Sequence, residues 1–328
     1  MESKYYIGSN KDKKIIKTSS SGGAFASIVH AWFEMYQDAF VCGCIMNDEL
    51  NAIHIFADNE EASIPMRGSK YIPSDLNGAL HYTLSYLKKG KAVLFSGTPC
   101  QVSALNKFLY SKCIDTSNLL TVEVICHGVA NKNFFKDYIS HLEKKYKSDA
   151  ISINFRAKCR PGNIQDMQVK FSNGKVYNAS STKYDWFYSL YNNNIILQSG
   201  CYSCPFAKKE RYADISLGDA WGKSVNFGKS LILVNTPKGD MILHRIKIDM
   251  DLKEIEPDEV DQPTLYHPAI KPDNYDEFWR LYNEKGYLAA QKYVGNNTLK
   301  TKTIDKIVYI ADLLGIKQYL KRITKKKD

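Results

Sequence analysis

Four cysteines have the residue type and the surroundings expected of thiolate ligands. Cys201 and Cys204 form a CxxC pair, in which the two intervening residues let both sulfurs bind one metal centre. Cys100 follows a Ser-Gly-Thr-Pro run, and Cys126 is followed by His-Gly. Together these thiols would be enough for a single zinc ion or for one iron–sulfur cluster.

The arrangement of the four thiols favours the cluster over zinc. A structural zinc site usually uses two CxxC pairs, whereas Cys100 and Cys126 come from two separate segments. Pro205 directly follows the CxxC, as it does in ferredoxin sequences. The alternative is a zinc-stabilised, non-redox binding protein that recruits a partner or an anionic surface through its basic tail.

Predicted strands and helices bring two of these cysteines to one place. Apolar runs predict strands at 91–95 and 119–125, and Thr98 and Pro99 are suited to the N-cap and first position of a following helix. Cys100 and Cys126 then follow the carboxyl ends of two successive strands, at the edge where open α/β sheets bind ligands. We expect Cys100 in the first turn of its helix, where the helix dipole stabilises a thiolate.

The rest of the chain predicts a mixed α/β (α+β) fold. Strands alternate with helices in the first half, and the second half is rich in strands with an Asn173-Gly174 turn. We predict a mixed sheet flanked by helices, a β-rich C-terminal half and a basic C-terminal helix. The further predicted strands are 40–46 with a hairpin partner at 53–56, then 151–155, 167–171, 175–177 and 230–235. The predicted helices are 132–147, 184–192 and 303–327. Residues 237–270 are predicted to be loop-rich with a short helix.

Composition narrows the class of protein. The chain has 328 residues, no apolar signal-like start and no run of about 20 apolar residues, which predicts a cytoplasmic protein. Eight cysteines in a reducing compartment indicate metal binding or catalysis rather than disulfides. Residues 300–328 hold nine Lys and Arg against three Asp, so most of the net charge of +10 belongs to this tail. The nearly neutral body argues against nucleic-acid binding.

Short motifs in a fixed order resemble the coenzyme F-420 (deazaflavin) hydrogenase/dehydrogenase beta-subunit family. The resemblance covers about residues 17–270. Its motifs are Ser20-Ser21-Gly22-Gly23, Gly68-Ser69-Lys70-Tyr71, Ser96-Gly97-Thr98-Pro99-Cys100-Gln101, Cys126-His127-Gly128, Phe155-Arg156-Ala157-Lys158, Cys201-Tyr202-Ser203-Cys204 and Ala213-Asp214-Ile215 with Gly218-Asp219-Ala220-Trp221-Gly222.

The resemblance implies an iron–sulfur flavoprotein oxidoreductase. Cys100, Cys126, Cys201 and Cys204 would hold a [4Fe–4S] cluster beside a flavin, FAD or alternatively FMN. Electrons would pass between the cluster, the flavin and a small organic hydride donor or acceptor, deazaflavin-like or other. The expected regions are a flavin-binding region at 1–95, a region carrying the cluster ligands at 96–275 and a helical basic tail at 276–328.

The resemblance also proposes roles for single residues. Ser21, Gly22, Gly23, Ser69, Lys70, Tyr71, Ser96, Gly97 and Thr98 would bind the flavin, and His127 and Asp219 are the candidate catalytic residues for proton transfer. A glycine-rich loop before a helix suits a phosphate, because backbone N–H groups can approach the anion. The ordinary alternatives are helix caps for the serine and threonine, a solvated surface residue for the lysine and a packed neighbour for the histidine.

Family members often carry an N-terminal ferredoxin-like domain with further clusters. Only about 18 residues, none of them cysteine, precede the glycine-rich loop here. We therefore expect electrons to arrive from an external carrier such as ferredoxin or from a partner subunit. The tail is interpreted as a solvated amphipathic helix, with contact to an anionic membrane surface or to an acidic partner as the alternative.

Overall fold

A computed structural model describes residues 2–158, 166–179, 185–222 and 228–294. The chain forms two compact units, and each unit combines two separate stretches of sequence. The first unit comprises residues 1–129 and 198–269, and the second comprises 130–197 and 270–328. The predicted regions 1–95, 96–275 and 276–328 remain predictions. They describe functional regions of the family, whereas each compact unit combines two separate stretches of the chain.

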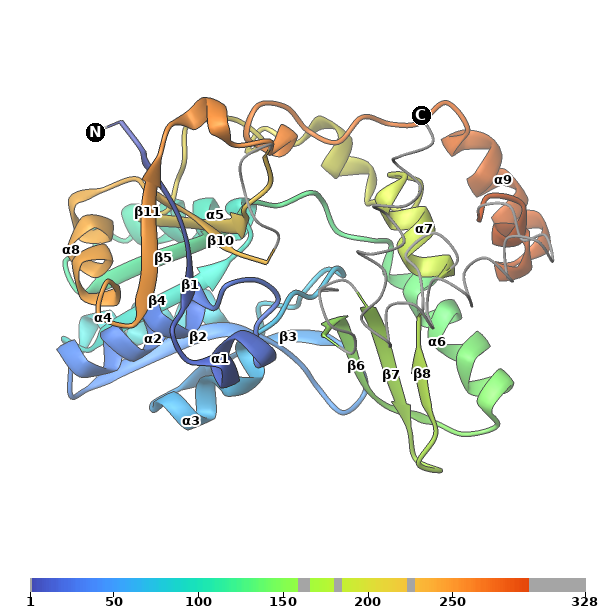
Figure 1. The fold of residues 1–328 in the computed structure, drawn as a ribbon, viewed down its shortest axis with the longest axis horizontal. Coiled ribbons are helices and arrows are strands. Elements are labelled where there is room, and N and C mark those ends of the chain that lie inside the picture. Colours follow the sequence, from blue (N-terminus) through green and yellow to red (C-terminus); the bar gives the residue numbers. More distant parts are fainter. Residues whose placement is uncertain (1, 159–165, 180–184, 223–227, 295–328) are drawn as a thin grey trace, which may run out of the picture. The chain divides into compact units, whose positions relative to one another are not determined.

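The first unit is built on an eight-stranded mixed sheet in the order β11-β1-β10-β9-β5-β4-β2-β3 (Figure 1). β2, β4, β5 and β9 run parallel to one another, and the remaining pairs are antiparallel. The strands are β1 (Lys4–Asn10), β2 (Ala39–Met46), β3 (Ala52–Ala57), β4 (Ala92–Gly97), β5 (Leu119–Val124), β9 (Ile215–Asp219), β10 (Ser230–Val234) and β11 (Met250–Ile255).

Helices cover both faces of this sheet, because its central strands are apolar on both sides. Leu94 of β4 packs in one cluster with α2 (Ala24–Met35) and α8 (Pro237–Ile246). Its neighbours Val93 and Phe95 point the other way and pack with α4 (Ala79–Lys88) and α5 (Pro99–Ser111). Shorter elements complete the unit, namely α1 (Lys13–Thr18), α3 (Glu60–Ser63) and the 3₁₀ turns Ile64–Met66, Ser199–Ser203, Pro257–Glu259 and Pro263–Leu265.

The second unit contains a three-stranded antiparallel sheet with an aromatic core. Asp185 is buried there and accepts hydrogen bonds from the hydroxyls of Tyr138 at 2.7 Å and Tyr177 at 2.8 Å. Burial raises the pKa of this carboxyl group. Its elements are α6 (Lys132–Tyr146), β6 (Ala150–Ala157), β7 (Asp166–Phe171), β8 (Val176–Asn178), α7 (Trp186–Asn192), α9 (Tyr275–Lys285) and the 3₁₀ turn Tyr287–Lys292.

The predicted mixed fold is confirmed, and β1 and β11 are among the elements that the sequence analysis missed. The hairpin of β2 and β3 is present, and α5 begins at Pro99 with Thr98 as its N-cap, as expected. β1 was not predicted, and the stretch expected to be loop-rich contains β11. The predicted basic helix at 303–327 lies outside the described residues. In the described part of the chain, no helix has the length and apolar character needed to cross a membrane.

Candidate functional site

Predicted site residues gather at one edge of the eight-stranded sheet. β4, β5 and β9 are adjacent and parallel, so their carboxyl ends meet at this edge. Thr98 and Cys100 follow β4, Cys126 and His127 follow β5, and Asp219 ends β9. The expectation that two cysteines follow adjacent strands is therefore confirmed.

The CxxC segment is attached next to Cys126. The Gln198 backbone N–H donates to the Val129 carbonyl at 2.8 Å, and the Cys201 N–H donates to the Gln198 carbonyl at 2.9 Å. Val129 lies three residues after Cys126, so this bond holds the start of the 3₁₀ turn Ser199–Ser203 against the loop that follows β5. The two segments that carry these cysteines are thus brought together although they are far apart in sequence.

The other three thiols of the predicted set lie near enough to Cys126 to affect its ionisation. Burial raises the pKa of Cys126 to about 12, and the nearby thiols of Cys201, Cys100 and Cys204 act in the same direction. Burial also raises the pKa of Cys201. A backbone N–H opposes each shift, from Gly128 toward Cys126 and from Val129 toward Cys201.

The chemistry of Cys126 and Cys201 suits thiolates that are compensated by a bound positive centre. Ionising neighbouring, partly buried thiols without such a centre is unfavourable, and a metal would remove that penalty. Backbone N–H groups that point at sulfur support the same assignment. Within the described residues, no group of three or more His, Cys, Asp or Glu side chains is placed to hold a metal ion.

Hydrogen bonds connect three of the segments predicted to bind flavin. The Ser20 hydroxyl accepts from the Ser69 backbone N–H at 2.7 Å. Five residues later in the same segment, the Ser74 hydroxyl accepts from Gln101 Nε2 at 2.9 Å. Gln101 Oε1 in turn accepts from the Thr98 backbone N–H at 2.9 Å. Hydrogen bonds therefore link the glycine-rich loop to the segment 68–74, and that segment to the start of α5.

The two loop glycines have a packing role of their own. A Cβ atom on Gly22 would overlap the Gly8 carbonyl oxygen and lie 2.7 Å from the Ser230 backbone nitrogen. Gly23 is the N-cap of α2 and has a φ of 90°, which favours glycine. The Ser21 hydroxyl donates to the Lys229 carbonyl at 2.5 Å, so this loop is tied to the strands beneath it.

Lys70 is held by backbone carbonyls, so its interpretation as a solvated surface lysine is wrong. Its ammonium group donates to the carbonyls of Pro65, Met66 and Arg67 at 3.0–3.1 Å. Burial lowers its pKa to about 8. The positive charge of Lys70 therefore lies against the preceding backbone and stabilises the carboxyl end of the 3₁₀ turn Ile64–Met66.

Sequence reasoning missed a buried ion pair beneath the cysteines. Arg211 Nε donates to Glu123 Oε1 at 2.5 Å, and the two side chains are 2% and 0% exposed. The sequence did contain a signal of this pair. Glu123 is a charged residue in the largely apolar strand β5, and a charged side chain that is buried there requires a partner.

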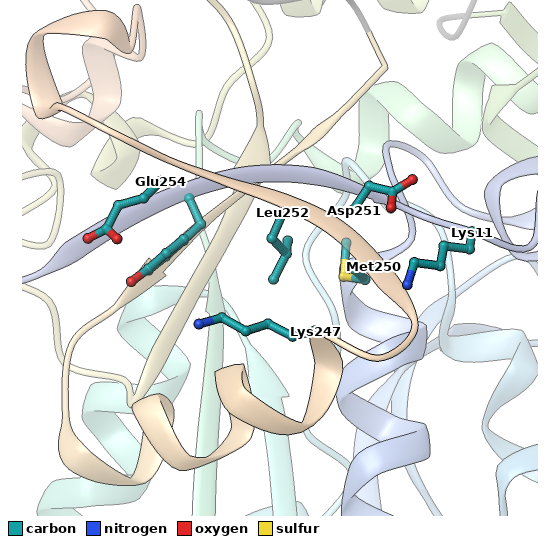
Figure 2. A pocket seen from close by; sticks show the side chains of 7 residues that line it. Lys11, Lys247, Met250, Asp251, Leu252 and Glu254 are labelled. Carbon is teal, nitrogen blue, oxygen red and sulfur yellow. The ribbon is translucent and has the colours of Figure 1, made fainter.

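A pocket of about 470 Å³ lies elsewhere in the first unit, along β11 (Figure 2). None of the predicted site residues lines it. Its lining residues are Tyr6, Lys11, Lys247, Met250, Asp251, Leu252 and Glu254. The pocket is therefore not part of the cysteine site.

Comparisons with known proteins agree on the relationship. The family model for the C-terminal part of the coenzyme F420 hydrogenase/dehydrogenase beta subunit matches residues 90–260, more than half of the chain. This stretch contains all four cysteines. A search of curated proteins finds no match.

A chain of the F420-reducing [NiFe] hydrogenase complex from Methanosarcina barkeri has a similar fold. The TM-score is 0.53 and the identity 21%, over 88% of this chain and 90% of that chain. The family match and the fold lead to the same conclusion: this chain belongs to the coenzyme F420 hydrogenase/dehydrogenase beta-subunit family.

Proposed function

We propose that this protein is an iron–sulfur flavoprotein oxidoreductase that passes electrons between a [4Fe–4S] cluster, a bound flavin and an organic hydride donor or acceptor. Membership of the family indicates an oxidoreductase with an iron–sulfur role. The finer proposal is supported by the positions of Cys100 and Cys126 after the adjacent parallel strands β4 and β5, and by the hydrogen bond from Gln198 to Val129 that holds the CxxC segment near Cys126. When bound, the cluster supplies single electrons and the flavin exchanges hydride.

The chain's own residues would hold the cluster in a protected setting. Cys126 and Cys201 are the more buried ligands, and the N–H groups of Gly128 and Val129 stabilise their thiolates. Cys100 lies in the first turn of α5, where the helix dipole favours negative charge. The wide sequence separation of these ligands supports a cluster over zinc held by paired CxxC motifs.

For the flavin, we propose FAD, with FMN as the alternative, at the connected segments around the glycine-rich loop. The N-terminus of α2 has no side-chain cap at Gly23, which suits a flavin phosphate. Ser21, Gly22, Ser69, Lys70, Tyr71 and the stretch Ser96, Gly97 and Thr98 complete the proposed site. The contact of 3.0 Å between the Thr98 hydroxyl and the Cys100 sulfur supports a flavin close to the cluster.

We propose that His127 and Asp219 hold or move a proton at this edge. His127 follows β5, directly after Cys126, and Asp219 is the last residue of β9. Electrons would come from an external carrier or a partner subunit; the fold relative belongs to a multi-subunit hydrogenase complex, which supports the second source.

The deciding experiment is the iron, acid-labile sulfide, zinc and flavin content of protein purified without oxygen. About four iron and four sulfide per chain with flavin supports the proposal. The Cys201→Ser variant should lose the cluster absorption, whereas Cys113→Ser, which removes an exposed thiol outside the set of four, should keep it. Zinc without flavin or sulfide in the wild-type protein would refute the proposal and favour a zinc-stabilised binding protein.

A further inference from the structure

The buried pair of Glu123 and Arg211 connects the strand of one cysteine to the segment of two others. Glu123 lies on β5, three residues before Cys126, and Arg211 lies seven residues after Cys204. Both side chains are almost fully buried. Ser216 of β9 completes the contact, because its hydroxyl donates to Glu123 Oε1 at 2.8 Å and accepts from Arg211 Nε at 3.3 Å.

Arg211 also fixes the shape of its own segment. Its Nη1 donates to the Lys208 carbonyl at 3.0 Å, which closes a turn three residues long. The neighbouring Tyr212 carbonyl accepts from Asn106 Nδ2 of α5 at 2.8 Å, and the Tyr212 ring packs edge-on against Phe206. The stretch from Cys204 to residue 212 therefore contacts β9 and also α5 and β5, the elements that position Cys100 and Cys126.

This pair is poorly suited to a role in stability alone. Taking two charges out of water costs free energy, and apolar replacements of buried ion pairs are often neutral or stabilising. Among the described residues, Glu123 Oε2 and Arg211 Nη2 are buried without a hydrogen-bond partner. The pair instead joins β5 to the segment that directly follows the CxxC.

We propose that Glu123 and Arg211 are positioning residues that hold Cys201 and Cys204 at the correct distance from Cys126 and Cys100. This inference rests on the proposed function, because the distance matters only where all four thiols hold one cluster. Groups behind the direct ligands commonly change metal retention about 10- to 100-fold when they are removed.

The test replaces both partners together, Glu123→Leu with Arg211→Met, so that no buried charge is left unpaired. We expect a folded protein with cooperative thermal unfolding that loses iron to a chelator about 10-fold or more faster than wild type. We also expect a changed electron paramagnetic resonance spectrum of the reduced cluster. The control is Lys4→Met with Asp240→Asn, an ion pair of the same unit that joins β1 to α8, which should leave both readouts unchanged.

The outcomes separate this inference from the proposed function. A folded double variant with the iron retention and spectrum of wild type overturns the positioning role alone. Wild-type protein without iron and sulfide overturns the proposed function and this inference with it. If the double variant does not fold, Arg211→Lys decides, because a single ammonium cannot reproduce the contacts of Nε and Nη1. Faster iron loss in that variant supports the inference, and unchanged loss overturns it.

Discussion

At the scale of single residues, the Thr98 hydroxyl is the group most directly placed to influence the cysteine site. Its single proton has two acceptors within reach, the Cys100 sulfur at 3.0 Å and Gln101 Oε1 at 3.1 Å, and a thiolate at Cys100 would be the stronger acceptor. Hydrogen bonds to ligand sulfurs raise the reduction potential of iron–sulfur clusters. Thr98 was predicted as a flavin ligand, and the structure adds a contact to Cys100, a proposed cluster ligand.

Thr98→Val should lower the midpoint potential of the cluster, because it removes the hydroxyl and keeps the shape of the side chain. Thr98→Ser keeps the hydroxyl and serves as the control, with a potential close to that of wild type. A redox titration followed by electron paramagnetic resonance measures both. Equal potentials in the two variants would show that the hydroxyl has no influence on the cluster.

The residues of the site differ in how well the sequence predicts them. The cap at Thr98 and the position of Cys100 in the first turn of α5 depend on local signals, and the sequence predicted both. Lys70 was predicted to bind the flavin, with a solvated surface lysine as the alternative, and neither interpretation included the three backbone carbonyls that its ammonium group contacts in the folded chain. Arg211 escaped notice because its partner lies 88 residues away.

At the scale of elements, the glycine-rich loop before α2 is tied closely to β1 and β10. The Asn10 backbone N–H donates to the Gly22 carbonyl at 2.7 Å, and the Gly22 α-carbon faces the backbone of both strands. This packing explains the glycine without any ligand. The loop therefore has a structural requirement that must be separated from its proposed role in flavin binding.

Gly22→Ala should lower the free energy of unfolding by about 1–3 kcal/mol, the typical cost of overpacking a close contact. Denaturant unfolding of flavin-free protein measures this packing effect separately from the cofactor. Gly200→Ala is the control, because a Cβ there meets open space, and its effect should stay within about 0.5 kcal/mol. A Gly22 variant as stable as wild type would contradict the packing role.

The α2 surface carries a pH-dependent contact at His30. A hydrogen bond to the Glu60 carboxylate at 3.0 Å, with the charges of Glu60, Glu34 and Asp249, raises the pKa of His30. A raised pKa in the folded state means that the protonated ring stabilises the protein at low pH. This contribution is complete below the unfolded value of about 6.5 and disappears as the pH rises through the folded value.

His30→Gln should therefore reduce stability at pH 5.5 and leave it almost unchanged at pH 8.5. The ring is 41% exposed, so we expect an effect below about 1 kcal/mol. Thermal unfolding of both proteins at the two pH values measures it, and His244→Gln on the exposed side of α8 controls for loss of a partly exposed histidine. A loss of equal size at both pH values would contradict the titration.

Among the elements, those with strong local patterns were predictable. β4 and β5 are continuous apolar runs bounded by polar turns, which is typical of strands buried on both faces. β1 and β11 escaped notice because their stability comes from distant partners. β1 has only three consecutive apolar residues before Gly8, and β11 is an edge strand that alternates apolar with charged residues.

At the scale of the whole molecule, the chain leaves the first unit and returns to it at neighbouring points. Val129 and Gln198 are joined by a backbone hydrogen bond of 2.8 Å, and the stretch 130–197 between them belongs to the second unit. All four cysteines lie in the first unit. Since inserted stretches with adjacent ends can be replaced by short loops, the first unit is a candidate for independent folding.

A chain in which a short Gly/Ser linker replaces residues 130–197, and which ends at residue 269, should fold cooperatively. We expect the helix and strand signals of circular dichroism to be retained, and iron to bind at the level of the full chain. The matched control is the same shortened chain with Cys201→Ser, which should fold equally well and bind no cluster. A shortened chain that unfolds without a cooperative transition would show that the first unit depends on the second.

The position of β1 in the sheet also determines when this protein can fold during synthesis. Lys4 pairs with Val234 of β10, and Tyr5 pairs with Ile255 of β11. A ribosome therefore releases β1 long before either neighbour exists, and both edges of β1 are not paired until residue 255 has emerged. Contacts of such long sequence separation slow folding and expose strand edges to aggregation. The nascent chain is thus expected to depend on chaperones until β1 has paired with β10 and β11.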